Sequence, residues 1–498
     1  MSASIISEIT RPSATFAGFY RFREVDGTLV VTNAQGDFIL LTREEFKGFV
    51  EGTIARGTEM YERLKRGNFL RAEFDVPAAV ERLKRRKRFV HNGPNLHMIV
   101  VTLRCNETCV YCHASRANMD AVHTDMTKET AEKAVDLILQ TPSQYVTIEF
   151  QGGEPLVNFG VVKHLIEYAE AKNREVGKYL EFTMVSNLAL MDEEKLAWLL
   201  DHKVQICTSI DGPEHLHDKQ RKLIASSAFK VAVHWIKRIN QAYGERGLDT
   251  SLYHVEALLT TTREALSRGR EIVDTYEALG CRALFLRPLD PFGFVEKTHQ
   301  RVEYPREEYL SFYRDTTDYI IQKNLQGAQI LERYAAIFLT KILVGEDPNF
   351  LDIRSPAGAG ISAIAYNYDG LVFAGDEARM LHETGDDTFL LGRLGELTWN
   401  QMVSHPTIRA LVLASNLDGR PDCVNCAYNP YCGVCPVHTY KTQGSMVGRM
   451  RESTVCMVHK GIQDYLFTKI RQNDPATMEV FRRWTINRTR EHFLHVPE

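Results

Sequence analysis

The chain has 498 residues, of which 44% are hydrophobic and 25% are charged, a composition typical of globular proteins. This length predicts two to four domains, and the net charge of −4 gives no electrostatic basis for binding nucleic acid or an anionic membrane. No apolar run is long enough to span a bilayer, and Met1–Arg11 lacks the basic and apolar parts of a signal peptide. The ten cysteines gather mainly at two places, which favours metal binding in a reducing cytoplasm over disulfides.

Residues 16–90 are predicted to form a small α+β domain. Alternating apolar residues and intervening turns predict strands at 19–25, 29–32 and 38–41. Helices are expected at 42–50, 59–66 and 76–88, the first started by a capping box from Thr42 to Glu45. Six basic residues lie within 82–88. We favour a solvated helix end for this basic run over a docking surface for an acidic peptide.

Residues 95–300 alternate between predicted strands and predicted helices. The strands are expected at 98–103, 145–150, 180–185, 204–210, 254–259 and 283–286. The helices between them include 128–140, 161–174, 193–202 and 264–279. Repeated strand–helix units predict a parallel sheet or partial barrel with right-handed crossovers. In such folds the active site lies at the carboxyl ends of the strands.

The C-terminal third is predicted to contain three parts. A helical bridge is expected at 301–350, and a partly β, glycine-containing segment with a second cysteine cluster at 351–460. Residues 461–498 are expected to form a C-terminal helix.

The first cysteine cluster follows directly after the first strand of the alternating region. Cys105, Cys109 and Cys112 are spaced CxxxCxxC. Three thiolates can hold three irons of an iron–sulfur cluster, which leaves the fourth iron open to a ligand. The alternative is a structural zinc site completed by His113, but such sites favour CxxC pairs. We therefore favour an iron–sulfur cluster with an open iron.

A second motif, Gln151-Gly-Gly-Glu-Pro155, ends the second predicted strand. Together with the CxxxCxxC motif it resembles the radical SAM superfamily. The resemblance implies that Cys105, Cys109 and Cys112 hold a catalytic [4Fe–4S] cluster, whose open iron binds S-adenosylmethionine (SAM). One electron from the cluster would then release a 5′-deoxyadenosyl radical. Gly152, Gly153, Glu154 and Pro155 match the family stretch that binds the SAM amino group.

Further strand ends match this family in order. The resemblance places Asn187 against the SAM ribose, with Ser209 at the end of the fourth strand. Arg221 suits a contact with the SAM carboxylate, and Tyr111 is expected to pack on the adenine. Asp211 is a candidate substrate-side acid or base, and its alternative is an Asx turn before Gly-Pro.

The second cysteine cluster indicates another metal site. It contains Cys423, Cys426, Cys432, Cys435 and Cys456. Structural zinc is one interpretation, but the stretch resembles the C-terminal SPASM domain of peptide-modifying radical SAM enzymes, which holds auxiliary [4Fe–4S] clusters. That pattern has two further cysteines upstream, about where this chain has Ala357 and Gly375.

We therefore expect one auxiliary [4Fe–4S] cluster on Cys423, Cys426 and Cys432. Its fourth ligand is Cys456 by the resemblance or Cys435 by compact spacing, and we favour Cys456. The two isolated cysteines, Cys207 and Cys281, are expected to be buried small hydrophobic residues.

The N-terminal domain resembles the winged-helix-like peptide-recognition element (RRE) of enzymes that mature ribosomally made peptides. That element takes the leader peptide as an added strand. More of the chain resembles the His-Xaa-Ser system radical SAM maturases, in Phe19–Arg23, Gly36–Thr42, Tyr366–Gly370, Asp376–Arg379 and Tyr431–Pro436. The implied fold is α/β: a partial (β/α)6 TIM-like barrel between the winged-helix-like domain and a SPASM-like iron–sulfur domain.

The expected function is modification of a ribosomally made precursor peptide, by cross-linking or cyclisation, in the cytoplasm. An external electron donor such as flavodoxin or ferredoxin is implied. One alternative is an anaerobic sulfatase-maturase-like enzyme that forms formylglycine. Another is a peptide-binding scaffold that holds zinc or iron–sulfur and has no turnover.

Overall fold

The computed structural model describes residues 12–224, 226–486 and 491–497. Met1–Arg11, where the sequence predicts no signal peptide, lies outside the described residues. Among the described residues, none of the helices combines the length and the apolar character that crossing a bilayer requires.

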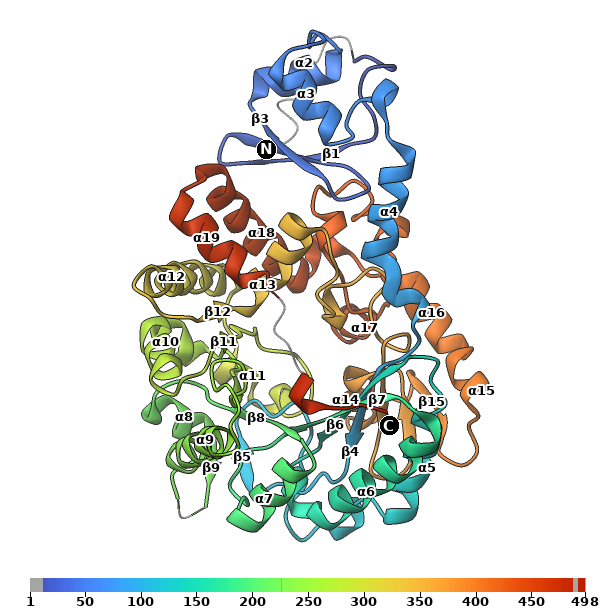
Figure 1. The fold of residues 1–498 in the computed structure, drawn as a ribbon, viewed down its shortest axis with the longest axis vertical. Helices are drawn as coiled ribbons and strands as arrows, with labels where there is room; N and C mark the ends of the chain where they lie inside the picture. Colours follow the sequence, from blue (N-terminus) through green and yellow to red (C-terminus); the bar gives the residue numbers. More distant parts are fainter. Residues whose placement is uncertain (1–11, 225, 487–490, 498) are drawn as a thin grey trace.

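The N-terminal unit forms at one end of the molecule's long axis (Figure 1). It consists of β1 (Arg21–Val25), β2 (Thr28–Thr32), β3 (Phe38–Leu41), α2 (Arg43–Glu51), α3 (Glu59–Arg66) and α4 (Val76–Lys87). The three strands pair antiparallel in the order β1-β2-β3, which leaves β3 at an edge. The predicted capping box is confirmed, since Thr42 and Glu45 exchange hydrogen bonds at the start of α2. The sheet encloses a separate hydrophobic core together with α2 and α3.

A larger sheet forms the centre of the molecule. Its strands run in the order β10 (Glu256–Leu258), β8 (Gln205–Ser209), β7 (Tyr179–Val185), β6 (Tyr145–Gln151), β4 (Leu96–Val100), β13 (Ala363–Tyr366), β14 (Leu371–Phe373) and β15 (Leu390–Arg393). The first five of these pair parallel to their neighbours, as the sequence predicted. The connecting helices are α5 (Lys128–Ile138), α6 (Phe159–Val176), α7 (Glu193–Asp201), α8 (Glu214–Gln220) and α9 (Ala228–Glu245), and α10 (Gly269–Ala278) follows β10. The sheet is mixed and open, which is consistent with a partial barrel.

The predicted sixth strand is shorter than expected and lies outside this sheet. Only β11 (Ala283–Leu284) forms, and it pairs parallel to β12 (Leu331–Glu332) in a separate two-stranded sheet. One isolated parallel bridge, between Thr260 and Arg287, pairs the chain after β10 with the chain after β11. Helices α11 (Val295–Val302), α12 (Arg306–Leu325) and α13 (Arg333–Leu339) follow.

The segment after the helical bridge contributes directly to the central sheet. Its first strand, β13, pairs parallel to β4. The strand that precedes the CxxxCxxC motif therefore has a hydrogen-bonded neighbour along each edge, β13 and β6. Alternation of strands and helices could not reveal this, because β13 is a short apolar run far from β4 in sequence. The remaining helices are α14 (Asp376–His382), α15 (Trp399–Val403), α16 (Pro406–Ser415) and α17 (Pro436–Gln443).

The C-terminal segment is not the single helix that the sequence predicted. Helix α18 (Thr454–Gln472) ends at Asn473, which is left-handed, and α19 (Pro475–Trp484) starts anew with a proline in its first turn. Proline suits a first turn because the missing N–H would have no partner there. A short strand, β16 (Leu494–His495), then pairs antiparallel with β7.

The basic run of α4 is less solvated than expected. Arg82 forms an ion pair with Asp37, while Arg86 donates to the Gln35 carbonyl at 3.0 Å and lies over the Tyr431 ring. The interpretation as a solvated helix end is therefore wrong for Arg82 and Arg86. Their charges hold α4 against its neighbours, while Arg85 remains exposed.

Candidate active site

The three cysteines of the CxxxCxxC motif lie just beyond the carboxyl end of β4. Cys109 belongs to the short strand β5 (Glu107–Cys109), which pairs antiparallel with β9 (Arg221–Leu223). The register puts Cys109 opposite Arg221, and the Arg221 Nη1 atom lies 3.7 Å from the Cys109 sulfur. All three cysteines line a cavity of about 490 Å³ at the open end of the barrel.

Burial makes free thiolates unfavourable at this position. The pKa of Cys105 is raised to about 12, chiefly by burial and also by the nearby Glu154 carboxylate and Cys112 thiol. Burial also raises the pKa of Cys109, although Arg221 opposes that rise. Bound metal offsets such a penalty, because metal-ligating cysteines are deprotonated.

The two glycines of the second motif hold the backbone that leads to Cys105. Gly153 donates its N–H to the Thr102 carbonyl at 2.8 Å, and Glu154 donates to the Arg104 carbonyl at 2.8 Å. Gly152 adopts a positive φ of 149°, which strongly favours glycine. A Cβ atom at Gly153 would lie 2.6 Å from the Arg104 carbonyl carbon, closer than real contacts allow. The glycines therefore permit a close backbone contact beside the cysteine loop.

We expect Gly153→Ala to displace the cysteine loop, because its methyl group would meet the backbone of 103–104 rather than a flexible side chain. SAM cleavage should fall at least about 10-fold, with a loss of iron from the three-cysteine site. Gly160→Ala is a matched control, since nothing lies within 4 Å of its added carbon and alanine favours helices. Iron content and 5′-deoxyadenosine yield measure both variants, and equal values for the two would contradict this steric role.

Glu154 connects the ends of two strands below the cavity. Its carboxylate accepts hydrogen bonds from the Ser186 hydroxyl at 2.7 Å, the Asn187 N–H at 2.7 Å and the Leu156 N–H at 3.0 Å. The side chain is 1% exposed, and burial raises its pKa to about 7 despite these donors. Pro155 is buried and begins the short helix after Glu154. Glu154 thereby fixes the loop that carries Asn187, whose amide donates to Asn106 beside Cys105.

A second polar network holds Arg221 and Tyr111 together. The Tyr111 hydroxyl donates to the Asp211 carboxylate at 2.6 and 2.5 Å, and Arg221 Nε donates to the same carboxylate at 3.1 Å. The Arg221 guanidinium also lies over the Tyr111 ring, 5.3 Å from its centre. Asp211 is 0% exposed and is not among the lining residues of the cavity. This placement favours a positioning role for Asp211 over the acid or base role expected from the sequence.

Most of the expected cofactor residues meet at this one cavity. Its lining includes Cys105, Cys109, Tyr111, Cys112, Gly152, Gly153, Glu154, Asn187, Ser209 and Arg221. The structure therefore brings together the ends of β4, β6, β7 and β8, as expected for a barrel site. Pro155 is buried at the start of the short helix after Glu154 and does not line the cavity.

A polar lining deeper in the barrel was not expected from the sequence. It consists of alternate residues on the strands, Glu149, Thr183, Gln205, Cys207 and Glu256. Alternation along a strand could have revealed this face, because every second side chain points inward. Cys207 is half-buried and lines the cavity, so its expected burial is wrong. Cys281 is buried, as predicted.

Four of the five C-terminal cysteines converge on a second site. Cys423, Cys432 and Cys456 belong to one small packed cluster, and Cys426 donates its N–H to the Cys423 carbonyl at 3.0 Å. Burial raises the pKa of Cys432, and the neighbouring Cys456 and Cys426 thiols raise it further. The pKa values of Cys423, Cys432 and Cys456 are each raised by neighbouring thiols of this set, Cys426 included, so the four thiols lie close together.

Cys435 faces a different environment. Its sulfur lies with carboxylate oxygens of Asp352 and Glu377, all within 4.8 Å of one another. Burial raises the pKa of Cys435, and these two acids raise it further. This geometry favours Cys456 over Cys435 as the fourth ligand of an auxiliary cluster.

Comparison with known proteins identifies the class of domain at the centre of the chain. Residues 99–255 match the model of the radical SAM superfamily, and this stretch contains both motifs and the strand ends described above. These residues form a radical SAM domain, whose cofactors are SAM and a [4Fe–4S] cluster. The donor set fits that cluster, because three half-buried thiols converge beside a cavity that has room for a ligand.

Individual relatives match at low identity. The chain is 23% identical to the radical SAM cyclopropyl synthase TigE of Paramaledivibacter caminithermalis over 203 residues, covering 38% of this chain and 40% of that protein. It is 25% identical to the cysteine-type anaerobic sulfatase-maturating enzyme of Clostridium perfringens over 253 residues, covering 49% and 64%. The chain thus spans less than two thirds of the length of these curated relatives.

Solved structures share the fold over a longer stretch. Native anSMEcpe with bound AdoMet superposes with a TM-score of 0.63 and 18% identity, covering 78% of this chain and 99% of that one. Streptococcus suis SuiB bound to the precursor peptide SuiA gives a TM-score of 0.51 and 14% identity, covering 89% and 99%. These similarities support the α/β partial-barrel fold with additional N- and C-terminal parts.

Proposed function

We propose that this protein is a radical SAM maturase that cross-links or cyclises a ribosomally made precursor peptide. The main supporting observation is that one chain combines three features: the three-cysteine cavity, a separate four-cysteine site, and an N-terminal sheet with an open edge. Similarity to a cyclopropyl synthase, and in fold to a protein bound to its precursor peptide, supports a peptide substrate.

In this proposal Cys105, Cys109 and Cys112 hold the catalytic cluster, and the other residues position SAM. When bound, the [4Fe–4S] cluster supplies the electron that cleaves SAM and starts hydrogen abstraction from the peptide. Arg221, held by Asp211, presents a guanidinium beside the cysteine loop that suits a carboxylate.

The four-cysteine site supports one auxiliary [4Fe–4S] cluster held by Cys423, Cys426, Cys432 and Cys456. Its chemistry would be acceptance of the electron that an oxidative cross-link releases. An external donor such as flavodoxin or ferredoxin would supply the electron for SAM cleavage. We place the reaction in the cytoplasm, because such thiolate sites need a reducing compartment.

The N-terminal unit supports recognition of a leader peptide at the edge of β3. A cavity of about 560 Å³ lies beside residues 35–40, between the N-terminal unit and 342–345. Four arginines line it: Arg63, Arg66, Arg82 and Arg85. Arg63 already donates to the Leu40 carbonyl at 3.3 Å, while Arg66 and Arg85 are exposed. An extended, acidic leader segment suits this edge, since main-chain pairing gives affinity and the arginines give selectivity.

We expect Arg85→Glu to weaken binding of the precursor peptide about 10-fold, because it places a negative charge in the lining of this cavity. Lys84→Glu makes the same charge change one residue earlier, where the side chain is exposed and pairs with Glu81. That control should change affinity less than about 2-fold. Fluorescence anisotropy with a labelled peptide from the neighbouring reading frame measures both. Equal effects would place the leader elsewhere.

Co-expression with that peptide, followed by mass spectrometry, tests the proposed reaction. A cross-link joins two positions and removes two hydrogens, whereas formylglycine carries an aldehyde that a hydrazide reagent traps. The fold similarity to a sulfatase-maturating enzyme makes formylglycine formation the second candidate, and hydrazide labelling would establish it. If the loaded protein releases no 5′-deoxyadenosine from SAM and reductant, it is a binding scaffold and the proposal fails.

A further inference from the structure

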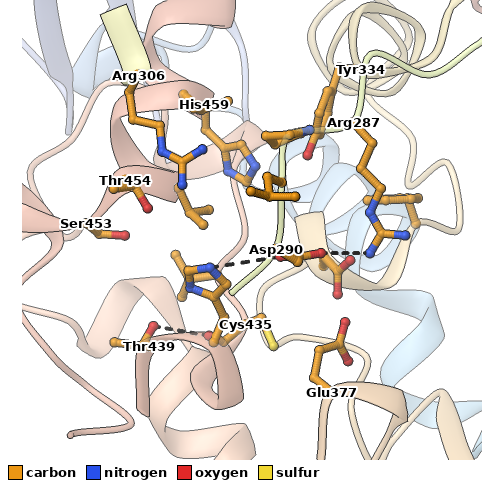
Figure 2. Close-up of a pocket in the computed structure, with 18 of the residues that line it drawn as sticks. Arg287, Asp290, Arg306, Tyr334, Glu377, Cys435, Thr439, Ser453, Thr454 and His459 are labelled. Atoms are coloured by element: carbon orange, nitrogen blue, oxygen red, sulfur yellow. Dashed lines mark hydrogen bonds and ion pairs between the residues drawn. The ribbon is translucent and has the colours of Figure 1, made fainter. Parts of the chain in front are cut away.

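A third group of metal-binding side chains lies apart from both cysteine sites. It joins Asp352, in the short helix Leu351–Ile353, with Glu377 in the first turn of α14 and Cys435 immediately before α17. One oxygen of each carboxylate and the Cys435 sulfur all lie within 4.8 Å of one another. Figure 2 shows Glu377 and Cys435 turned toward the same cavity, which has a volume of about 70 Å³. Three segments distant in sequence thus supply three potential ligands at one point.

The basic side chain that faces the two carboxylates of this group, Arg287, is paired with a different acid. The nearby Asp290 pairs with Arg287 at 3.1 Å, and Asp376 pairs with Arg379 at 2.9 Å. Among the described residues, neither Asp352 nor Glu377 forms a salt bridge. Arg287 offsets only part of the cost of enclosing two neighbouring carboxylates, so a cation between them would stabilise this region.

His438 lines the same cavity but is not one of the converging ligands. Its ring is buried, and its Nε2 atom faces an Asp290 oxygen 4.0 Å away. Neither ring nitrogen lies within 4.8 Å of all three other ligand atoms. The group therefore supplies three protein ligands and leaves a fourth position for water.

We propose that Asp352, Glu377 and Cys435 bind a single Zn²⁺ ion. One sulfur and two carboxylate oxygens are donor types that zinc accepts, and a water molecule would complete a tetrahedral site. Calcium and magnesium require mainly oxygen donors. A [4Fe–4S] cluster is disfavoured, because it takes cysteine thiolates and this group has one.

The zinc site would stabilise the boundary between the catalytic cavity and the four-cysteine site. Phe285, Arg287 and Phe350 line both the cavity of this group and the catalytic cavity. Cys435 lies in the same chain segment as the four-cysteine site. A zinc ion would therefore fix α14 and α17 where the barrel meets the C-terminal region, a positioning role that goes beyond the proposed peptide chemistry.

Element analysis of the full chain, purified without oxygen and washed with a chelator, tests this site. We expect about one zinc per chain besides the iron, and zinc-edge X-ray absorption with one sulfur near about 2.3 Å and nitrogen or oxygen near about 2.0–2.1 Å. Cys435→Ser and Glu377→Gln should each lower zinc at least about 10-fold while iron is retained. Cys281→Ser is the matched control, because Cys281 is a buried thiol outside this group.

Three results would overturn the proposal. The first is wild-type protein with less than about a tenth of a zinc per chain. The second is a zinc shell of sulfur alone, which would place zinc among the other cysteines. The third is full zinc in both variants. Because the first two are measured on the wild-type protein, unstable variants do not leave the question open, and none of the three depends on peptide modification.

Discussion

We expect Cys112→Ser to abolish SAM cleavage, lowering the 5′-deoxyadenosine yield at least about 1,000-fold. Cys112 lines the catalytic cavity together with Cys105 and Cys109, and a serine hydroxyl is a poor substitute for a thiolate on iron. Three thiolates are needed to hold three of the four irons and keep the fourth open to SAM, and the two remaining cysteines are too few. Iron should therefore fall from about 8 to about 4 atoms per chain, because the four-cysteine site is separate.

Cys281→Ser serves as the control for this prediction. Cys281 is also a free cysteine, but it is 2% exposed within the hydrophobic core and does not line the catalytic cavity. It should retain about 8 iron atoms and measurable SAM cleavage. If Cys112→Ser cleaved SAM at the wild-type rate, the three-cysteine cavity would not be the catalytic site. Peptide binding to the N-terminal unit should be the same in both variants.

The parts of the site that sequence could predict are those written in contiguous residues. The CxxxCxxC motif and the Gly152–Pro155 stretch each follow a strand with a clear apolar pattern, and parallel strands bring their carboxyl ends together. The order of strands along the chain therefore implied that Asn187 and Ser209 meet the cysteines. The structure places both in the lining of the same cavity.

The remaining parts depend on contacts between distant residues. Tyr111 and Asp211 are 100 positions apart, and their hydrogen bond requires β5 to pair with β9 in one register. Neither short strand has enough residues to show a pattern. The pairing of β13 with β4 was equally hidden. The position of Cys435 was ambiguous because spacing alone cannot show which way a thiol points.

The contacts of the N-terminal unit suggest how a bound leader would influence the auxiliary site. Tyr431, directly before Cys432, donates its hydroxyl to the Gly36 carbonyl at 3.0 Å, and Gly36 lines the cavity beside β3. Arg23 pairs with Asp464 on α18 at 2.7 Å. The proposed leader site therefore contacts the four-cysteine region directly. Leader binding that shifts residues 35–40 would reach the residue next to a cluster ligand through one hydrogen bond.

Replacing the fourth ligand of the auxiliary cluster is the second change for which we expect a large effect, on the iron content. We expect Cys456→Ser to lose the auxiliary cluster, lowering iron to about 4 atoms per chain, because its thiol lies among Cys423, Cys426 and Cys432. Cys435→Ser should keep about 8, because that thiol faces Asp352 and Glu377 instead. The two variants make the same chemical change in the same cysteine cluster, so they form a matched pair.

Activity separates the two cysteine sites further. Cys456→Ser should still cleave SAM, because the three-cysteine cavity is intact, but peptide cross-linking should fall at least about 100-fold without an acceptor for the surplus electron. Iron analysis, 5′-deoxyadenosine yield and peptide mass spectrometry measure these quantities on one preparation. If Cys435→Ser lost the iron and Cys456→Ser kept it, the compact spacing would define the cluster. If Cys456→Ser lost the iron but cross-linked the peptide at the wild-type rate, the electron would leave by another route, and the auxiliary cluster would be structural.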